Sequence, residues 1–193
     1  MRNYDLHAWL EKKRERELKQ VERECRSLIK KGFVALDTET TGLSAVDEII
    51  QIGIIDHSYN VLVDTKINPE IPINPRASAV HRMYREDVID APIFPQVYDD
   101  VCKALNGRTV VIYNAEFDKF KLSYMRVKHG LPPITCQKIV DIMSMYSTYA
   151  GEYSWRHKAY KWQPLPYGNH SAVGDAIALV KLIYRMAGLP VNL

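Results

Sequence analysis

The chain has 193 residues and a mass of 22.2 kDa, the size of one ordinary domain with at most a short appendage. Its 47% hydrophobic and 25% charged residues are typical of a folded globular protein and exclude fibrous and disordered classes. The net charge is +3, but residues 1–31 alone carry ten basic and six acidic residues. A basic arm on a slightly acidic body indicates either a polyanionic partner or an ordinary charged helix.

Cysteine usage and hydropathy favour a cytoplasmic protein. Cys25, Cys102 and Cys136 are far apart and form no C-x-x-C pair, so we expect neither a disulfide framework nor a thiolate zinc site. No apolar run approaches the length of a membrane span, and the amino end lacks the apolar core of an export signal. We therefore expect no membrane partner.

Residues 6–31 contain no Pro or Gly and predict a long charged helix. One narrow apolar stripe runs along it and consists of Leu18, Val21, Cys25 and Leu28. Three uses of this helix stay open. It could follow a phosphate backbone, form a coiled-coil contact with a second copy or a partner protein, or fold back on the domain.

The body of the domain begins with apolar runs typical of buried strands. The predicted strands are 33–36, 48–55, 60–67 and 109–113. The predicted helices are 77–83, 86–89, 95–105, 114–129, 140–149 and 171–187. This order predicts an α/β fold with a mixed β-sheet flanked by helices, in which residues 1–31 are a helical extension and residues 32–193 the domain.

Carboxylates follow two of these strands, at the sheet edge where sites form in α/β proteins. Asp37 and Glu39 come directly after strand 33–36 and point to one side, because alternate residues of an extended chain share a face. Asp118 lies shortly after strand 109–113, and Asp175 borders the apolar stripe of helix 171–187. Each acid taken alone could be an ordinary residue of a solvated turn or of the first turn of a helix.

Taken together, four hard oxygen donors without a Cys or paired-His cluster favour Mg²⁺ or Mn²⁺ over zinc. Two such ions, ~3.5–4 Å apart, can activate a water and stabilise a leaving oxygen in phosphate chemistry. A neutral histidine could accept the proton of that water near pH 7, and His170 is the candidate.

Three motifs carry a family resemblance, and they are Asp37-Thr-Glu-Thr-Thr-Gly42, Asn114-Ala-Glu-Phe-Asp118 and His170-Ser-Ala-Val-Gly-Asp175. In order and spacing they resemble the motifs of the DEDDh 3′→5′ exonucleases, the group of the DNA polymerase III epsilon subunit and ribonuclease T. The resemblance covers about residues 32–188. The usual Gly-Ile after His81 is replaced by Arg82-Met83, and Arg76 stands where an acid is usual.

The resemblance implies an RNase H-like fold, two Mg²⁺ or Mn²⁺ ions per site, and release of nucleoside 5′-monophosphates from 3′ ends of single-stranded nucleic acid. DNA is favoured as substrate, with a role in repair or proofreading. It implies a metal-binding and catalytic set of Asp37, Glu39, Asp118 and Asp175, with His170 as general base. It also implies substrate contacts from Thr40, Thr41, Leu43, His81, Asn114 and Phe117.

Two alternatives stay open. The aromatic stretch 153–167, interleaved with basic residues, could stack on single-stranded nucleic acid or could seal an edge of the core. The whole chain could also be a noncatalytic adaptor that binds a partner protein or nucleic-acid ends. The four carboxylates and His170 are all present in the sequence, which favours the enzyme over the adaptor.

Overall fold

The computed structural model describes the backbone of residues 3–191 and the side chains of residues 8–191. The strands are β1 (Val34–Thr40), β2 (Ile49–Asp56), β3 (Val61–Lys66), β4 (Thr109–Ile112), β5 (Lys138–Asp141), β6 (Tyr153–Ser154) and β7 (Ala159–Tyr160). The helices are α1 (Asn3–Lys31), α2 (Pro75–His81), α3 (Arg85–Val88), α4 (Phe94–Leu105), α5 (Ala115–Lys128), α6 (Ile142–Ala150) and α7 (Ala172–Met186).

Five strands form one mixed sheet in the order β3-β2-β1-β4-β5. β2 is antiparallel to both of its neighbours, β1 and β3, as expected for strands joined by a short turn. β4 is parallel to β1 and β5, and helices cross over between these parallel strands. The α/β architecture with a mixed sheet flanked by helices is therefore confirmed.

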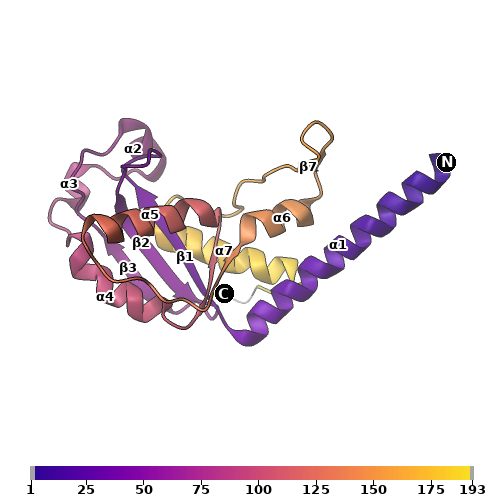
Figure 1. The fold of residues 1–193 in the computed structure, drawn as a ribbon, viewed down its shortest axis with the longest axis horizontal. Helices are drawn as coiled ribbons and strands as arrows, with labels where there is room; N and C mark the ends of the chain where they lie inside the picture. The colour runs from indigo at the N-terminus through magenta and orange to yellow at the C-terminus, as the bar shows by residue number, and fades with distance from the viewer. Residues whose placement is uncertain (1–2, 192–193) are drawn as a thin grey trace.

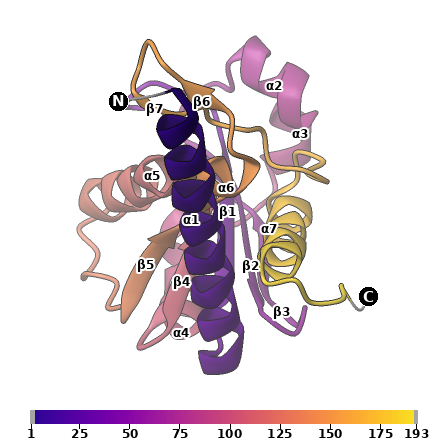
Figure 2. The same cartoon turned by 90° about the vertical axis from the view of Figure 1, so that its right-hand side faces the viewer.

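The sheet separates two apolar cores, as the alternation of side chains along β1 shows. Val34 and Leu36 point into the core formed with α4 and α5. Phe33 and Ala35 point into the core formed with α7, α6 and α1. Figure 2 shows α5 and α7 on opposite sides of the sheet. Successive residues at the end of β1 therefore face different helices.

The long charged helix is α1, and it contacts the domain from Arg14 onward, where the Arg14 guanidinium donates hydrogen bonds to the end of α6. Val21 and Cys25 of the predicted stripe are buried in the core that contains α7. The amino-terminal end of the helix extends away from the body (Figure 1). The helix ends at Lys31, and the division into an extension of residues 1–31 and a domain of residues 32–193 stays a prediction. Within residues 3–191, no helix combines the length and the apolar character needed to cross a membrane.

One predicted helix was wrong at its start. Residues 138–141, which include the first two residues of the helix predicted over 140–149, form strand β5, and α6 begins at Ile142. The strand has only four residues, and its hydrogen-bonding partner β4 lies far back in the chain, so no local pattern marks it. The segment 153–167 forms the β6–β7 hairpin and the start of a loop that leads to α7.

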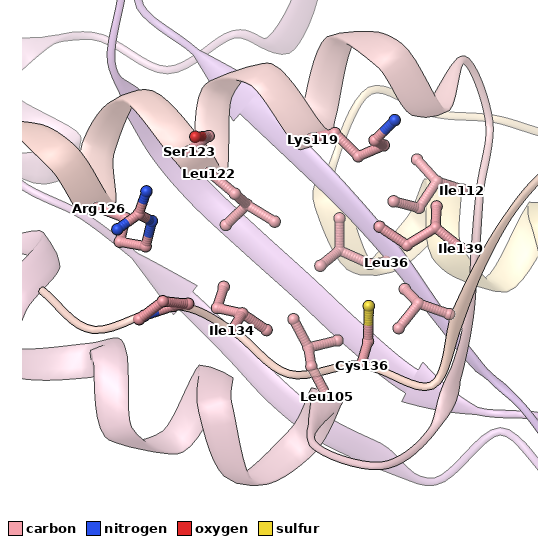
Figure 3. Close-up of a pocket in the computed structure, with 12 residues that line it drawn as sticks. Leu36, Leu105, Ile112, Lys119, Leu122, Ser123, Arg126, Ile134, Cys136 and Ile139 are labelled. Atoms are coloured by element: carbon pink, nitrogen blue, oxygen red, sulfur yellow. The ribbon is translucent and has the colours of Figure 1, made fainter.

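An apolar cavity of about 240 Å³ lies between α5 and the strands β4 and β5 (Figure 3). Its lining includes Leu36, Ile112, Leu122, Ile134 and Ile139. None of the four predicted carboxylates lines it. Lys119, Ser123 and Arg126 of α5 also line it, so this cavity opens at the surface and is separate from the predicted site.

Candidate active site

The candidate site forms where β1 extends beyond β4. β4 pairs with β1 only as far as Ile112, which lies opposite Leu36. Asp37 is the next residue of β1, and β1 continues to Thr40 with β2 as its only ladder partner. The parallel side of β1 is therefore open from Asp37 onward, which leaves room for side chains from the flanking helices.

Three carboxylates meet on the α7 side of this opening. Asp37 and Glu39 share a strand face with Ala35, which packs in the core containing α7. Asp175 lies in the first turn of α7. One carboxylate oxygen from each of Asp37, Glu39 and Asp175 lies within 4.8 Å of the others. The structure thus brings Asp37 and Glu39 together with Asp175, which lies 138 positions after Asp37 in the chain.

The fourth carboxylate reaches the site from the other side of the sheet. Thr38 points away from its two acidic neighbours, and its hydroxyl donates a hydrogen bond of 2.7 Å to Oδ1 of Asp118. Asp118 lies in the first turn of α5 and is only 3% exposed. Sequence reasoning missed Thr38, although its place between Asp37 and Glu39 in an extended strand predicts the opposite orientation.

Burial raises the pKa values of Asp37, Glu39 and Asp118. Burial, followed by the charges of Asp118, Asp175 and Glu39, raises the pKa of Asp37 well above its ordinary value. Burial, then Asp175 and Asp118, raises the pKa of Glu39 to about 7. Burial also raises the pKa of Asp118 to about 7, against the opposing hydrogen bond from Thr38. A cation would remove this penalty, and the oxygen donors suit a hard divalent ion.

Two residues of β2 hold the start of α7 against the sheet. Oε1 of Gln51 accepts a hydrogen bond of 3.1 Å from the backbone N–H of Ala172. A Cβ atom at Gly53 would lie 2.4 Å from the carbonyl carbon of Ala172, so the close approach of α7 requires glycine there. Gln51 and Gly53 both hold Ala172, and they thereby fix the position of Asp175, which lies three residues after Ala172. A lone glutamine in the apolar run 49–55 was the signal in the sequence.

His170 lies on the exposed loop directly before α7. Its backbone is left-handed, with φ of 60°, an unusual conformation for a non-glycine residue. Oδ1 of Asp175 accepts hydrogen bonds from the N–H groups of Asn169 and His170, at 2.7 and 3.2 Å. His81 is buried, which lowers its pKa, and the nearby His170 lowers that pKa further. The two predicted histidines therefore lie close together.

A cavity of about 550 Å³ opens beside the carboxylates, between the end of β1, α2 and the loop 42–47. Glu39, Thr40, Leu43 and His81 are among its lining residues. Leu43 stands at this cavity with 87% of its surface exposed. Arg76 also lines the cavity and gives it a positive charge where an acid is usual.

The other three predicted substrate residues lie elsewhere. The hydroxyl of Thr41 points into the loop, where it donates a hydrogen bond of 3.0 Å to Asp47. Asn114 caps α5, and Phe117 follows in its first turn. Both lie outside the lining of the 550 Å³ cavity, on the neighbouring element that carries Asp118.

Sequence reasoning also missed Lys121. This lysine is 1% exposed, and its Nζ donates hydrogen bonds to the carbonyl oxygens of Ser44 and Asp47. It therefore ties the loop that carries Leu43 to α5. Lys121 lies one turn after Asp118, so its helical spacing placed it on the inward face of the predicted helix.

The chain is similar in sequence to known exonucleases. Residues 34–183 match the family model of the ribonuclease T-type exonucleases. The chain is 33% identical over 138 residues to an uncharacterised exonuclease of Escherichia phage 186, covering 68% of this chain and 70% of that protein. It is 32% identical over 125 residues to the DNA polymerase III epsilon subunit of Escherichia coli K12. That match covers 58% of this chain and spans about half, 51%, of the subunit.

A solved structure shares the fold. E. coli Exonuclease I in complex with a dA16 oligonucleotide superimposes with a TM-score of 0.59 at 15% identity, over 81% of this chain and 42% of that one. At this identity the likeness concerns the fold alone. It bears out the RNase H-like architecture that the motifs imply.

Proposed function

The chain belongs to the exonuclease family whose model it matches over residues 34–183, and from this we propose that it is a metal-dependent 3′→5′ exonuclease. It would release nucleoside 5′-monophosphates from the 3′ end of single-stranded nucleic acid, with DNA favoured over RNA. The observation that carries this proposal is the convergence of Asp37, Glu39 and Asp175 within 4.8 Å, beside Asp118. Carboxylates gathered in this way suit phosphodiester hydrolysis.

The donor set fits Mg²⁺ or Mn²⁺. Its members are all carboxylates, and the raised pKa values of Asp37, Glu39 and Asp118 mean that a cation would stabilise their charged forms. Asp37, Glu39 and Asp175 would hold one ion, and Asp37 with Asp118 a second. When bound, such ions lower the pKa of water and stabilise the charge on the scissile phosphate and the leaving oxygen.

The chain's own residues supply the proton transfer and the substrate position. His170 would take the proton of the water whose oxygen attacks the phosphorus of the last phosphodiester linkage. The bond to the 3′-oxygen breaks, so the products are a nucleoside 5′-monophosphate and a strand shorter by one nucleotide with a 3′-hydroxyl. Asp175 holds the backbone of the loop that carries His170 and so helps to orient it.

The 550 Å³ cavity would receive the terminal nucleotide. Thr40 and His81 would line it, and Leu43 would insert between the last two bases, since its exposed side chain has no packing role in the fold. The hydroxyl of Thr41 bonds to Asp47, so its contribution would come through the loop. Asn114 and Phe117 would contact the strand from the start of α5.

The relatives support the substrate and the setting of this proposal. Exonuclease I is bound to a single-stranded deoxyoligonucleotide, and the epsilon protein is a polymerase subunit. We propose a role in DNA repair or proofreading, with the amino-terminal end of α1 available to a partner protein or a second copy. All three cysteines are free thiols, which supports a reducing, cytoplasmic setting.

The direct test uses a 5′-labelled single-stranded DNA of 20 nucleotides and Mn²⁺. A ladder that shortens from the 3′ end supports the proposal. His170→Ala should slow it by about 10²–10⁴, as expected for a lost general base. His57→Ala, at the far end of β2, is the matched control and should cleave at the wild-type rate.

Other products would contradict the proposal. Release of labelled mononucleotide as the first product would reverse the assigned direction. An intact strand at all Mn²⁺ concentrations would favour the noncatalytic adaptor. Wild-type cleavage by His170→Ala would remove that residue from the mechanism.

A further inference from the structure

The β6–β7 hairpin has an unusual composition that the proposed site does not use. Residues 153–162 contain four aromatic residues, three Lys or Arg residues and one histidine, and no carboxylate. The aromatic residues are Tyr153, Trp155, Tyr160 and Trp162. Cations interleaved with aromatic rings are the composition of surfaces that bind single-stranded nucleic acid.

The structure divides these four rings into two pairs. Tyr153 and Tyr160 lie opposite each other in the hairpin and are partly buried, with an edge-to-face contact at 5.4 Å between ring centres. Trp155 and Trp162 are 74% and 76% exposed. The Trp155 ring makes an edge-to-face contact with Tyr153 at 5.1 Å between ring centres. The tyrosines therefore close the hairpin, whereas both tryptophans keep most of their surface open to a ligand.

The hairpin is fixed to the body. The hydroxyl of Tyr160 donates a hydrogen bond to Glu17 of α1, and the guanidinium of Arg14 lies 5.7 Å from the centre of the Tyr160 ring. Arg14 also donates to the carbonyl oxygens of Thr148 and Tyr149 at the end of α6. In Figure 1 the hairpin rises above α6. The two tryptophans are thus held on an anchored platform.

The same segment leads into the active site. The hydroxyl of Tyr113, directly after β4, donates a hydrogen bond of 2.5 Å to the carbonyl oxygen of Gln163. The base of the hairpin therefore lies at the carboxyl end of β4, the sheet edge at which the carboxylates meet. The loop continues from Gln163 to His170 without interruption.

We infer that this hairpin platform, defined by Trp155, Arg156, Lys158, Lys161 and Trp162, is a second contact for single-stranded nucleic acid. It holds the strand several nucleotides upstream of the 3′ end. Bases stack on the two tryptophans, and the three cations contact phosphates. A duplex offers no free base faces, so the platform selects a single strand. The inference rests on the proposed function for the direction of the strand.

Binding without catalysis tests the platform directly. Fluorescence anisotropy of a labelled single-stranded DNA of 20 nucleotides, measured in EDTA, reports affinity in the absence of cleavage. Trp155→Ala combined with Trp162→Ala should weaken binding at least tenfold, since each stacked base contributes a factor of about 5 to 150. Phe120→Ala, an exposed aromatic on α5, is the control and should bind as the wild type does.

The salt dependence of binding tests the basic residues of the platform. Arg156→Gln combined with Lys158→Gln should reduce the slope of log affinity against log salt by about 1.4, because each phosphate contact on a single strand contributes about 0.7. Lys66→Gln combined with Lys103→Gln, on β3 and α4, should leave that slope unchanged. Equal affinity and equal slope in the wild type and both hairpin variants would overturn the inference.

Cleavage of a dinucleotide separates the inference from the proposed function. A dinucleotide is too short to reach the platform, so the tryptophan variant should cleave it at the wild-type rate while its KM for the 20-nucleotide strand rises about tenfold. If the wild type fails to cleave the dinucleotide and the long strand, the proposed function fails and the binding result stands. If the tryptophan variant keeps the wild-type KM for the long strand, the inference fails and the exonuclease stands.

Discussion

At Asp37 the requirements of folding and of catalysis oppose each other. This carboxylate is placed among Glu39, Asp118 and Asp175, and burial and these charges raise its pKa. A fold without a cation would be more stable with a neutral side chain there. The site therefore stores unfavourable charge that a bound metal relieves.

Asp37→Asn separates the two requirements. We expect this variant to raise the Tm of the metal-free protein at pH 8, because an amide of the same shape carries no charge to repel its neighbours. Nuclease activity should fall by at least about a hundredfold, since one metal ligand is lost. Differential scanning calorimetry in EDTA and the 5′-label assay measure the two effects.

Asp64→Asn is the matched control, because Asp64 is exposed on β3 and lies outside the carboxylate group. It should change neither Tm nor activity. A metal-free Tm of Asp37→Asn below that of the wild type at pH 8 would contradict the electrostatic account.

At the scale of elements, α5 joins the carboxylate group to the 550 Å³ cavity. Its first turn carries Asp118, and one turn later Lys121 holds the carbonyl oxygens of Ser44 and Asp47. The loop between those carbonyls and β1 carries Leu43 to the cavity. Lys121 is thus a positioning residue, which acts through the loop and does not touch the carboxylate group.

Lys121→Met should release this loop, because methionine keeps much of the apolar stem and lacks the donor. The carbonyl oxygens of Ser44 and Asp47 then lose a charged donor, and we expect a loss of about 1–3 kcal/mol in the free energy of unfolding. KM for an oligonucleotide should rise more than kcat falls. Urea denaturation and steady-state kinetics give the two numbers.

Lys119→Met supplies the comparison on the same helix. Lys119 is exposed and pairs with Glu116 on the surface, where such pairs contribute little. In the Lys119→Met variant, backbone hydrogen exchange over residues 42–47 should match that of the wild type. In the Lys121→Met variant, the same residues should exchange faster. Identical exchange in the two variants would mean that Lys121 does not hold the loop.

At the scale of the whole molecule, the site joins both layers of the fold. Asp118 comes from the α5 side of the sheet and Asp175 from the α7 side, and they meet at β1 because β4 ends opposite Leu36. A bound divalent ion would therefore link two layers that otherwise contact through the sheet. Metal binding should stabilise the entire domain.

The pH dependence of this stabilisation has a definite sign. Glu39 has an ordinary pKa of 4.5 that folding raises to about 7, and folding raises that of Asp118 from 3.8 to about 7. The stability linked to their protonation is fully present below the unfolded values and is lost as pH rises through about 7. The rise in Tm from EDTA to Mn²⁺ should accordingly be larger at pH 8 than at pH 5.

The difference between the EDTA and Mn²⁺ scans at each pH is the quantity to compare, because exposed acids with lowered pKa, such as Asp56 and Glu70, affect both scans alike. An increase in Tm that is the same at pH 5 and pH 8 would show that the carboxylates are already ionised in the metal-free protein.

The sequence by itself determined the elements with strong local patterns and the order of the three motifs. Periodicity places α1, α7 and the buried strands because side-chain spacing within one element is a local property. The shared direction of Asp37 and Glu39 was also predictable, since alternate residues of a strand lie on one face, and the family motifs implied that Asp175 joins them.

Only the tertiary structure decided the rest, because it depends on pairing between distant segments. Strand β5 exists through its ladder with β4, and the opening at Asp37 exists because β4 stops at Ile112. The roles of Lys121 and Gly53 follow from which loop and which helix lie against them. Local residue patterns fix what each element is, whereas the packing of one element on another fixes which side chains meet.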